Sequence, residues 1–141
     1  MERKDGFWIY PVGVIRKRDR DAYIEIYPEY KDGLLRLEHY SHIIVLFWFD
    51  KNDNPEQRSI LQVHPKRHKG APLSGVFATC SPVRPNLIGL TICKILSIED
   101  NVIKINDIDA FDNTPVIDIK PYVPRKHMIP ESEVKVPEWM K

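Results

Sequence analysis

The spacing of apolar residues predicts several short β-strands joined by turns. In Ala22–Tyr27, Ile24 and Ile26 alternate with polar or amphipathic residues, which is typical of a strand with one buried face. Ile43–Phe49 is an unbroken β-branched and aromatic run, which predicts a central strand buried on both faces. Leu90–Ile98 and Val102–Ile105 are separated by three turn-forming residues, so they predict a hairpin.

Weaker strand signals fill the rest of the chain. Trp8–Ile15 predicts a strand at an edge or bulge, because Pro11 lacks a backbone donor. The charged stretch 16–21 and the turn-rich stretch 52–57 predict loops, and residues 28–42 predict a short helical turn. The remaining predicted strands are Ile60–Val63, Val76–Thr79 and Pro115–Ile119.

Together these elements predict an all-β protein, a small single-domain β-barrel. Many short strands, frequent turns and the lack of an amphipathic helical pattern favour that architecture. The prolines at 121, 124, 130 and 137 predict an irregular, proline-rich C-terminal tail that wraps the surface or a partner. We therefore expect one domain over residues 1–141, with a core at about 9–124 and a tail at 125–141.

Composition narrows the function classes without choosing one. A chain of 141 residues is long enough to bury one core, and its 21 Lys and Arg nearly balance its 20 Asp and Glu. Nucleic-acid binding would therefore need a local basic patch. The longest apolar run has seven residues, which excludes a helical membrane span, and we expect a cytoplasmic protein. Cys80 and Cys93 are expected to be free thiols.

The segment Gly75–Thr91, GVFATCSPVRPNLIGLT, carries the clearest candidate chemistry. Pro82 and Pro85 fix the backbone and remove two donors, so the segment predicts a rigid, extended loop. Arg84, held between them, is expected to be a fixed donor to a ligand or to a backbone carbonyl that locks the loop. A rigid loop that presents Arg84 and Asn86 is typical of a ligand-holding segment.

The order HPKR, GVFATCSPVRPNLIGLT and DIDAFDNTPVIDIKPYVP resembles the TsaA-like family, and IEIYPEYKDGLLRLEHYSHIIVLFWF is similar to its N-terminal half. The resemblance covers residues 9 to 124. It implies a dimeric β-barrel that uses S-adenosylmethionine to methylate N6 of threonylcarbamoyladenosine in the tRNA anticodon loop. In agreement, the chain has no glycine-rich dinucleotide fingerprint after a strand.

The resemblance also implies the site residues. The implied catalytic group is Asp118, Lys120 and Tyr122. The implied cofactor contacts are Phe49, Asp50, Lys51, Cys80, Arg84, Asn86, Leu90, Asp112, Asn113, Thr114 and Pro115.

At three places the chain differs from the usual family pattern. It has Cys80 in place of a usual arginine and Leu87 in place of a usual proline. The linker between its first two strands is RKRDRD, without the family's proline-arginine-glutamine motif. Two alternatives therefore stay open: a non-catalytic barrel that binds RNA or a nucleotide-like ligand, and a methyltransferase with a different small acceptor.

The chemistry assigns provisional roles to the implied residues. The acceptor is a weak amide-like nitrogen, so a nearby proton acceptor would help, and Asp118 is the candidate. Lys120 would orient Asp118 or bind phosphate, and the alternative is an ordinary ion pair between them. Neutral polar groups suit the sulfonium better than a carboxylate does, and Asn113 with Thr114 fit that need.

Other reactive residues have simpler alternatives. The basic loop His64–Pro72 could bind tRNA phosphates through His64, Lys66, Arg67 and Lys69, or be a solvated loop. No metal site is expected, because Pro65 and Gly70 argue against one helical face for His64 and His68, and no third ligand is evident. Cys80 is expected to be a packed, inert residue. Six aromatic residues could include a base-stacking platform, although most are expected to be core: Trp8, Tyr10, Phe47, Trp48, Phe49 and Tyr122.

Overall fold

The computed structural model describes residues 5–141 and divides the chain into two compact units. The barrel unit comprises the described residues up to Trp48 together with Leu90–Pro121. The loop unit comprises Phe49–Gly89 and Tyr122–Lys141. The chain therefore crosses from one unit to the other three times, and each unit is described by itself below.

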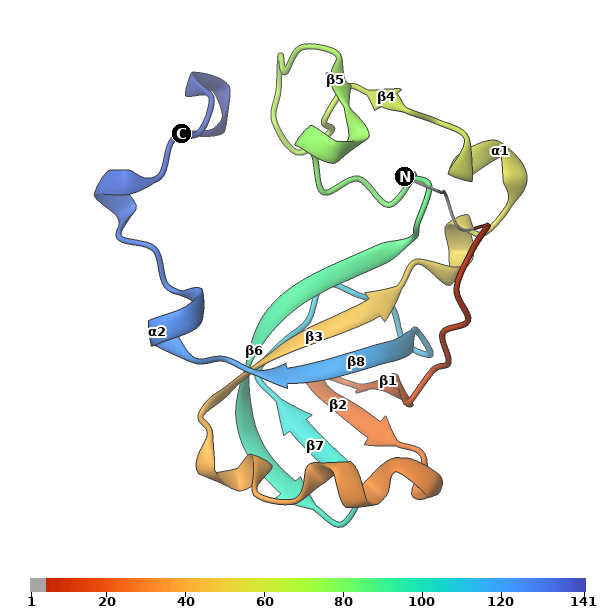
Figure 1. Ribbon diagram of the computed structural model, residues 1–141, viewed down its shortest axis with the longest axis vertical. Helices are drawn as coiled ribbons and strands as arrows, with labels where there is room; N and C mark the ends of the chain where they lie inside the picture. Colours follow the sequence, from red (N-terminus) through yellow and green to blue (C-terminus); the bar gives the residue numbers. More distant parts are fainter. Residues whose placement is uncertain (1–4) are drawn as a thin grey trace. The chain divides into compact units, whose positions relative to one another are not determined.

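Six strands form a closed barrel, which confirms the predicted all-β class (Figure 1). Around the barrel the order is β1-β2-β7-β6-β3-β8, and the β1–β2, β2–β7, β6–β7, β3–β8 and β1–β8 pairs are antiparallel. A closed barrel leaves no unpaired sheet edge. The strands are β1 (Gly13–Arg18), β2 (Asp21–Ile26), β3 (His42–Trp48), β6 (Ile88–Glu99), β7 (Val102–Ile105) and β8 (Pro115–Pro121).

The apolar positions that alternate in the sequence form the barrel core. Ile24 and Ile103 are fully buried and lie opposite each other in the β2–β7 pair. Ile43, Ile44 and Val45 are buried in succession on β3, as the prediction of burial on both faces requires. Gly13 is needed where β1 meets β2, because a Cβ there would clash with the Glu25 carbonyl and lie 3.1 Å from the Ile26 Cα.

Two short 3-10 helices follow β2, where the sequence predicts a helical turn. They are η1 (Pro28–Leu34) and η2 (Leu37–His39), which lie across one end of the barrel in Figure 1. Lys31 of η1 pairs with Asp100 in the β6–β7 turn. This contact raises the pKa of Lys31 and lowers that of Asp100, first through their hydrogen bond and then through charge attraction.

The loop unit has little regular structure and a small set of buried side chains. Its two-stranded sheet pairs β4 (Gln62–Val63) with β5 (Ser74–Gly75). Ala71, Val76 and Leu87 are its buried apolar residues among those described. The other elements are single turns: η3 (Asp50–Asn52), α1 (Pro55–Arg58), η4 (Val76–Ala78), α2 (Pro124–His127), η5 (Glu131–Glu133) and η6 (Glu138–Met140).

Three predicted elements are wrong in position or type. Residues 8–12 are not in a strand, and Trp8 and Tyr10 are exposed rather than core. The charged stretch 16–21 is not a loop, because β1 continues to Arg18 and β2 begins at Asp21. Asp19 adopts a positive φ of 54° in the tight turn between them. Val76–Ala78 is a 3-10 turn, because strand pairing ends at Gly75.

Both cysteines are free thiols, as expected. Cys93 is fully buried on β6, and burial raises its pKa to about 11. Cys80 is exposed, so the expectation that it is packed is wrong. Within residues 5–141, no helix is long and apolar enough to cross a membrane. The same residues contain no group of three or more His, Cys, Asp or Glu that could hold a metal ion.

Candidate functional site

Residues 79–87 of the loop unit, which we call the proline loop, are held by hydrogen bonds from two arginines. Arg84 Nη1 donates to the carbonyls of Thr79 and Ser81, each at 3.1 Å. Arg58 Nε donates to the Pro85 carbonyl at 2.9 Å. Of the two roles considered for Arg84, the structure thus shows the bond to backbone carbonyls. Arg58 was missed by the sequence analysis, because nothing near it in sequence indicates a partner 27 residues away.

Three candidate cofactor contacts lie where the chain leaves β3. The Phe49 N–H donates to the Leu87 carbonyl at 2.8 Å, which joins this turn to the proline loop. Asp50 and Lys51 follow in η3 and are exposed. Asn86, next to Leu87, is also exposed, as is Cys80 at the start of the loop. The loop unit therefore brings together Phe49 and the Asn86–Leu87 turn.

A second set of candidates belongs to the barrel unit and is fixed by β1. The Lys17 N–H donates to Asp112 Oδ1 at 2.8 Å, and Arg16 donates to the Asn113 side chain. Asn113 adopts a positive φ of 70°, which asparagine tolerates better than most residues. Thr114 is buried, whereas Asp112 and Asn113 remain exposed. Arg16 and Lys17, missed by the sequence analysis, therefore brace this loop.

The candidate catalytic residues lie on β8 and just after it. The Asp118 carboxylate accepts a bond from the Ile119 N–H at 2.9 Å, and the Lys120 ammonium lies 3.7 Å from it. The Asp118 and Lys120 side chains are half exposed or more, so this ion pair has the geometry of a weak surface pair. Tyr122, in the loop unit, stacks on His127 with ring centroids 5.6 Å apart. Leu90 on β6 is 60% exposed.

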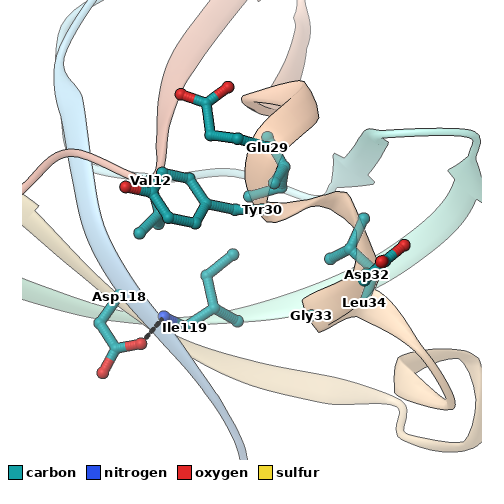
Figure 2. Close-up of a pocket in the computed structure, with 9 residues that line it drawn as sticks. Val12, Glu29, Tyr30, Asp32, Gly33, Leu34, Asp118 and Ile119 are labelled. Atoms are coloured by element: carbon teal, nitrogen blue, oxygen red, sulfur yellow. Dashed lines mark hydrogen bonds between the residues drawn. The ribbon is translucent and has the colours of Figure 1, made fainter.

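The barrel unit has a pocket of about 370 Å³ beside Asp118 (Figure 2). The Tyr30 ring from η1 and the Ile119 side chain from β8 face each other across it, whereas the Asp118 carboxylate turns back to the Ile119 N–H. Glu29 and Asp32 also line the pocket. These η1 residues were missed by the sequence analysis, because local patterns do not indicate that this segment lies next to β8.

The basic loop of the loop unit presents its charges to solvent. His64, Lys66, Arg67 and Lys69 are exposed, and the His64 Nδ1 atom lies 3.3 Å from the Ala71 carbonyl. The near-zero net charge of the chain conceals a marked difference between the units. The loop unit carries ten Lys and Arg against six Asp and Glu, and the rest of the chain carries eleven against fourteen. The loop unit is therefore the more basic of the two, and the role of this loop in binding tRNA phosphates stays a prediction.

Comparison with known proteins identifies the family. Residues 10–127, well over half of the chain, match the family model described as the tRNA-methyltransferase O N-terminal domain. The chain belongs to this family. The match extends from the segment before β1 to α2, so it includes the barrel strands, the proline loop and β8. The TsaA-like resemblance seen in the sequence is confirmed.

Relatives with similar sequences occur in archaea and mammals. A probable S-adenosyl-L-methionine-binding protein of Methanocaldococcus jannaschii is 46% identical over 114 residues, which cover 81% of this chain and 90% of that protein. The tRNA (adenine(37)-N6)-methyltransferase of Mus musculus is 44% identical over 91 residues, which cover 64% of this chain and 20% of that enzyme. The tRNA-methyltransferase O domain thus occurs in proteins of very different length.

Solved structures agree with the family assignment. The crystal structure of TrmO from Pseudomonas aeruginosa matches with a TM-score of 0.69 at 27% identity. The match covers 92% of this chain and 60% of that one. A second TrmO crystal structure matches with a TM-score of 0.69 at 29% identity, over 89% of this chain and 62% of that one. The chain therefore spans about three-fifths of the TrmO chains that it resembles.

Proposed function

We propose that this protein is an S-adenosylmethionine-dependent tRNA methyltransferase that methylates N6 of threonylcarbamoyladenosine 37 in the anticodon loop. The observation that carries the proposal is the family match over residues 10–127, since it includes every candidate site residue. The names of the M. jannaschii and mouse relatives support the cofactor and the position of the acceptor. Bases in an anticodon loop can be reached without opening a duplex.

The residues present suit S-adenosylmethionine, which supplies the methyl group when bound. Such a ligand needs neutral polar groups near its sulfonium and an apolar surface for its adenine ring. In the loop unit, the exposed amide of Asn86 offers the first kind of group. In the barrel unit, Asn113 offers a second amide and Leu90 an exposed apolar side chain. Asn86, Asn113 and Leu90 are thus accessible to a ligand and chemically suitable.

The residues of this chain would assist the transfer by positioning and by accepting a proton. The hydrogen bonds from Arg58 and Arg84 hold the proline loop, so Asn86 is presented from a fixed backbone. Fixed positioning of donor and acceptor lowers the barrier by up to about 7–11 kcal/mol in the best intramolecular cases. Asp118 would accept the proton of the acceptor nitrogen, and Lys120 would orient its carboxylate from 3.7 Å away.

The direct test measures cofactor binding and methyl transfer separately. Calorimetric titration with S-adenosylmethionine should show binding, and no binding at millimolar cofactor would remove the enzyme proposal. The protein is then incubated with tRNA that carries or lacks the threonylcarbamoyl group, and the nucleosides are weighed by mass spectrometry. A gain of one methyl on the modified tRNA alone is expected. Cofactor binding with no mass gain on either tRNA would favour a different small acceptor.

A non-catalytic binding protein is the second candidate, and the β1–β2 hairpin is the observation that favours it. The tight turn at Asp19 leaves no room for the family's proline-arginine-glutamine loop. Methyl transfer by the wild type separates the two candidates. Asp118→Asn then tests the catalytic role of this carboxylate, because it should abolish methyl transfer while cofactor binding persists. Arg36→Gln, an exposed change on the same barrel unit, should leave both unchanged. Equal methylation by Asp118→Asn and the wild type would remove the proposed role of Asp118.

Cys80 provides a probe of the cofactor contacts in the loop unit. Its side chain is exposed, so the arginine usual in the family can be introduced without breaking a packed contact. Cys80→Arg should tighten binding of S-adenosylmethionine, whereas Cys80→Ser should have little effect. Unchanged affinity in the arginine variant would show that position 80 is not a cofactor contact.

We also propose that the protein is a homodimer that buries the outer face of β6 around Ile92 and Leu96. These two side chains lie on the same face of the strand and are 49% and 51% exposed. Apolar rows of this kind commonly mark protein interfaces. Analytical ultracentrifugation should give twice the chain mass for the wild type and the chain mass for Ile92→Glu. A wild-type monomer at micromolar concentration would contradict the proposal.

A further inference from the structure

The loop unit contains two contacts between aromatic and imidazole rings, and the proposed methyl transfer assigns no step to either contact, although Tyr122 is also a catalytic candidate by family resemblance. His68 of the basic loop meets Trp139 with ring centroids 5.3 Å apart and planes at 67°. Tyr122 and His127 lie 5.6 Å apart with planes at 27°, which is a stacked arrangement. The C-terminal segment Tyr122–Lys141 supplies a ring to both contacts. After Val123, the residues of this segment are exposed except for Trp139, which is partly buried.

Local hydrogen bonds hold the second ring pair in place. His127 Nδ1 accepts the Val123 N–H at 2.9 Å, which fixes the imidazole within the α2 turn. Tyr122 directly precedes that turn, so the two rings are carried by one short stretch of backbone. A stack fixed in this way can contact a flat ligand without first losing much conformational freedom.

Exposed cations accompany both ring pairs. Lys66, Arg67 and Lys69 surround His68 in sequence, and Arg125 and Lys126 precede His127 in α2. Cations next to accessible rings are the combination that binds single-stranded nucleic acid, because the cations neutralise phosphates while the rings stack on unpaired bases. The loop unit as a whole carries more basic than acidic residues, so its net charge also favours binding of the negatively charged RNA backbone.

We propose that the C-terminal segment 122–141 is an arm that binds single-stranded RNA. The Tyr122–His127 stack contacts an unpaired base, and Arg125 and Lys126 bind the adjacent phosphates. Trp139, which lies against His68, adds a second base contact beside the basic loop. This inference rests on the proposed function in one respect, namely that the RNA in question is the tRNA substrate.

The first test removes two charges and compares two regions. Arg125→Gln/Lys126→Gln is compared with Arg20→Gln/Arg36→Gln, which removes two exposed charges from the barrel unit. Fluorescence anisotropy measures binding of an unmodified anticodon stem-loop RNA between about 50 and 300 mM salt, a range over which the Debye length shortens about 2.5-fold. The first pair should weaken binding roughly tenfold or more and reduce the salt slope by about 1.4, at about 0.7 per phosphate contact. An effect no larger than that of the control pair would overturn the proposal.

The second test separates stacking from charge. Tyr122→Leu should weaken RNA binding about fivefold or more, whereas Tyr122→Phe, which keeps the ring, should not. His127→Asn retains an acceptor for the Val123 N–H but removes the ring, so it should also weaken binding. Trp139→Leu should act in the same direction as Tyr122→Leu. Equal affinities of Tyr122→Leu and Tyr122→Phe would contradict base stacking, and circular dichroism checks that each variant is folded.

The readouts distinguish this inference from the proposed function. RNA binding is measured without cofactor, so it can succeed even where methylation fails. If the wild type methylates tRNA and every arm variant binds RNA as the wild type does, the RNA-binding arm is contradicted and the proposed enzyme function is supported. Conversely, if RNA binding depends on the arm but the protein does not bind S-adenosylmethionine, the RNA-binding arm is supported and the proposed enzyme function is contradicted.

Discussion

The two units of this chain are built on different principles. The barrel unit buries a row of β-branched side chains between six strands and carries more acidic than basic residues. The loop unit is basic and buries Ala71, Val76 and Leu87 as its apolar side chains among the described residues. Hydrogen bonds from Arg58 and Arg84 to carbonyls hold its proline loop.

The difference shows how the fold divides stability and recognition. Burial of apolar area stabilises the barrel, and this interaction does not depend on the orientation of the groups. Many different sets of apolar core residues would therefore give a stable barrel. Hydrogen bonds to carbonyls are directional, so the proline loop depends on the particular residues that make them. The candidate ligand contacts accordingly lie mainly in loops whose backbone conformation depends on hydrogen bonds from a few individual side chains.

The largest expected contrast is between the two thiols, one in each unit. Cys93 is fully buried with a pKa of about 11, whereas Cys80 is exposed. A thiol reacts as its thiolate, so both burial and the raised pKa protect Cys93. At pH 7.5 a maleimide should modify Cys80 at least about a thousandfold faster than Cys93, because Cys93 reacts only through rare opening. Mass spectrometry counts the labels, and two rapid labels on the native protein would show that the barrel is not tightly packed.

The next contrast concerns the barrel core. Ile24→Ala removes a fully buried side chain and should lower the free energy of unfolding by about 2–5 kcal/mol. Leu35→Ala, at a position that is 80% exposed, should change it by no more than about 0.5 kcal/mol. Urea denaturation followed by circular dichroism measures both. Similar midpoints for the two variants would mean that the barrel does not provide the main stability of the molecule.

The barrel was predictable from the sequence because its signals are local. Alternation in Ala22–Tyr27 and the apolar run Ile43–Phe49 report strand burial directly, and the structure places β2 and β3 there within one residue at either end. The β1–β2 hairpin was not predictable in this way. Arg16 and Lys17 resemble loop residues by composition, yet they pair with Tyr23 and Ala22.

The candidate site was predictable only in part. The prolines around Arg84 indicated a rigid loop, which the structure shows to be held through the Thr79 and Ser81 carbonyls. The contact between Arg58 and the Pro85 carbonyl depends on tertiary structure and leaves no local pattern. The roles of Asp118 and the other catalytic and cofactor candidates came from the family resemblance, and they stay predictions.

A smaller effect is expected from weakening the proline loop. Arg84→Lys keeps the positive charge but replaces the planar fork that reaches both the Thr79 and Ser81 carbonyls. Loss of these bonds should cost about 1–3 kcal/mol locally. Hydrogen exchange should therefore speed up in residues 79–86 while barrel amides stay protected. Arg36→Lys, on the exposed turn before η2, is the matched control. Exchange that rises equally in the barrel would show that the two units unfold together.

The smallest effect is expected from the ion pair between Lys31 and Asp100, because both side chains are at least half exposed. The lowered pKa of Asp100 means that its contribution exists above the ordinary value of 3.8 and is lost as pH falls through the lower folded value. The raised pKa of Lys31 means that its contribution exists below 10.5 and is lost as pH rises through the higher folded value. Lys31→Gln should therefore lower the Tm slightly at pH 7 in low salt, and high salt should remove the difference. A large, salt-independent loss would show instead that Lys31 acts through packing, which is the non-directional type of stabilisation that the rest of the barrel unit uses.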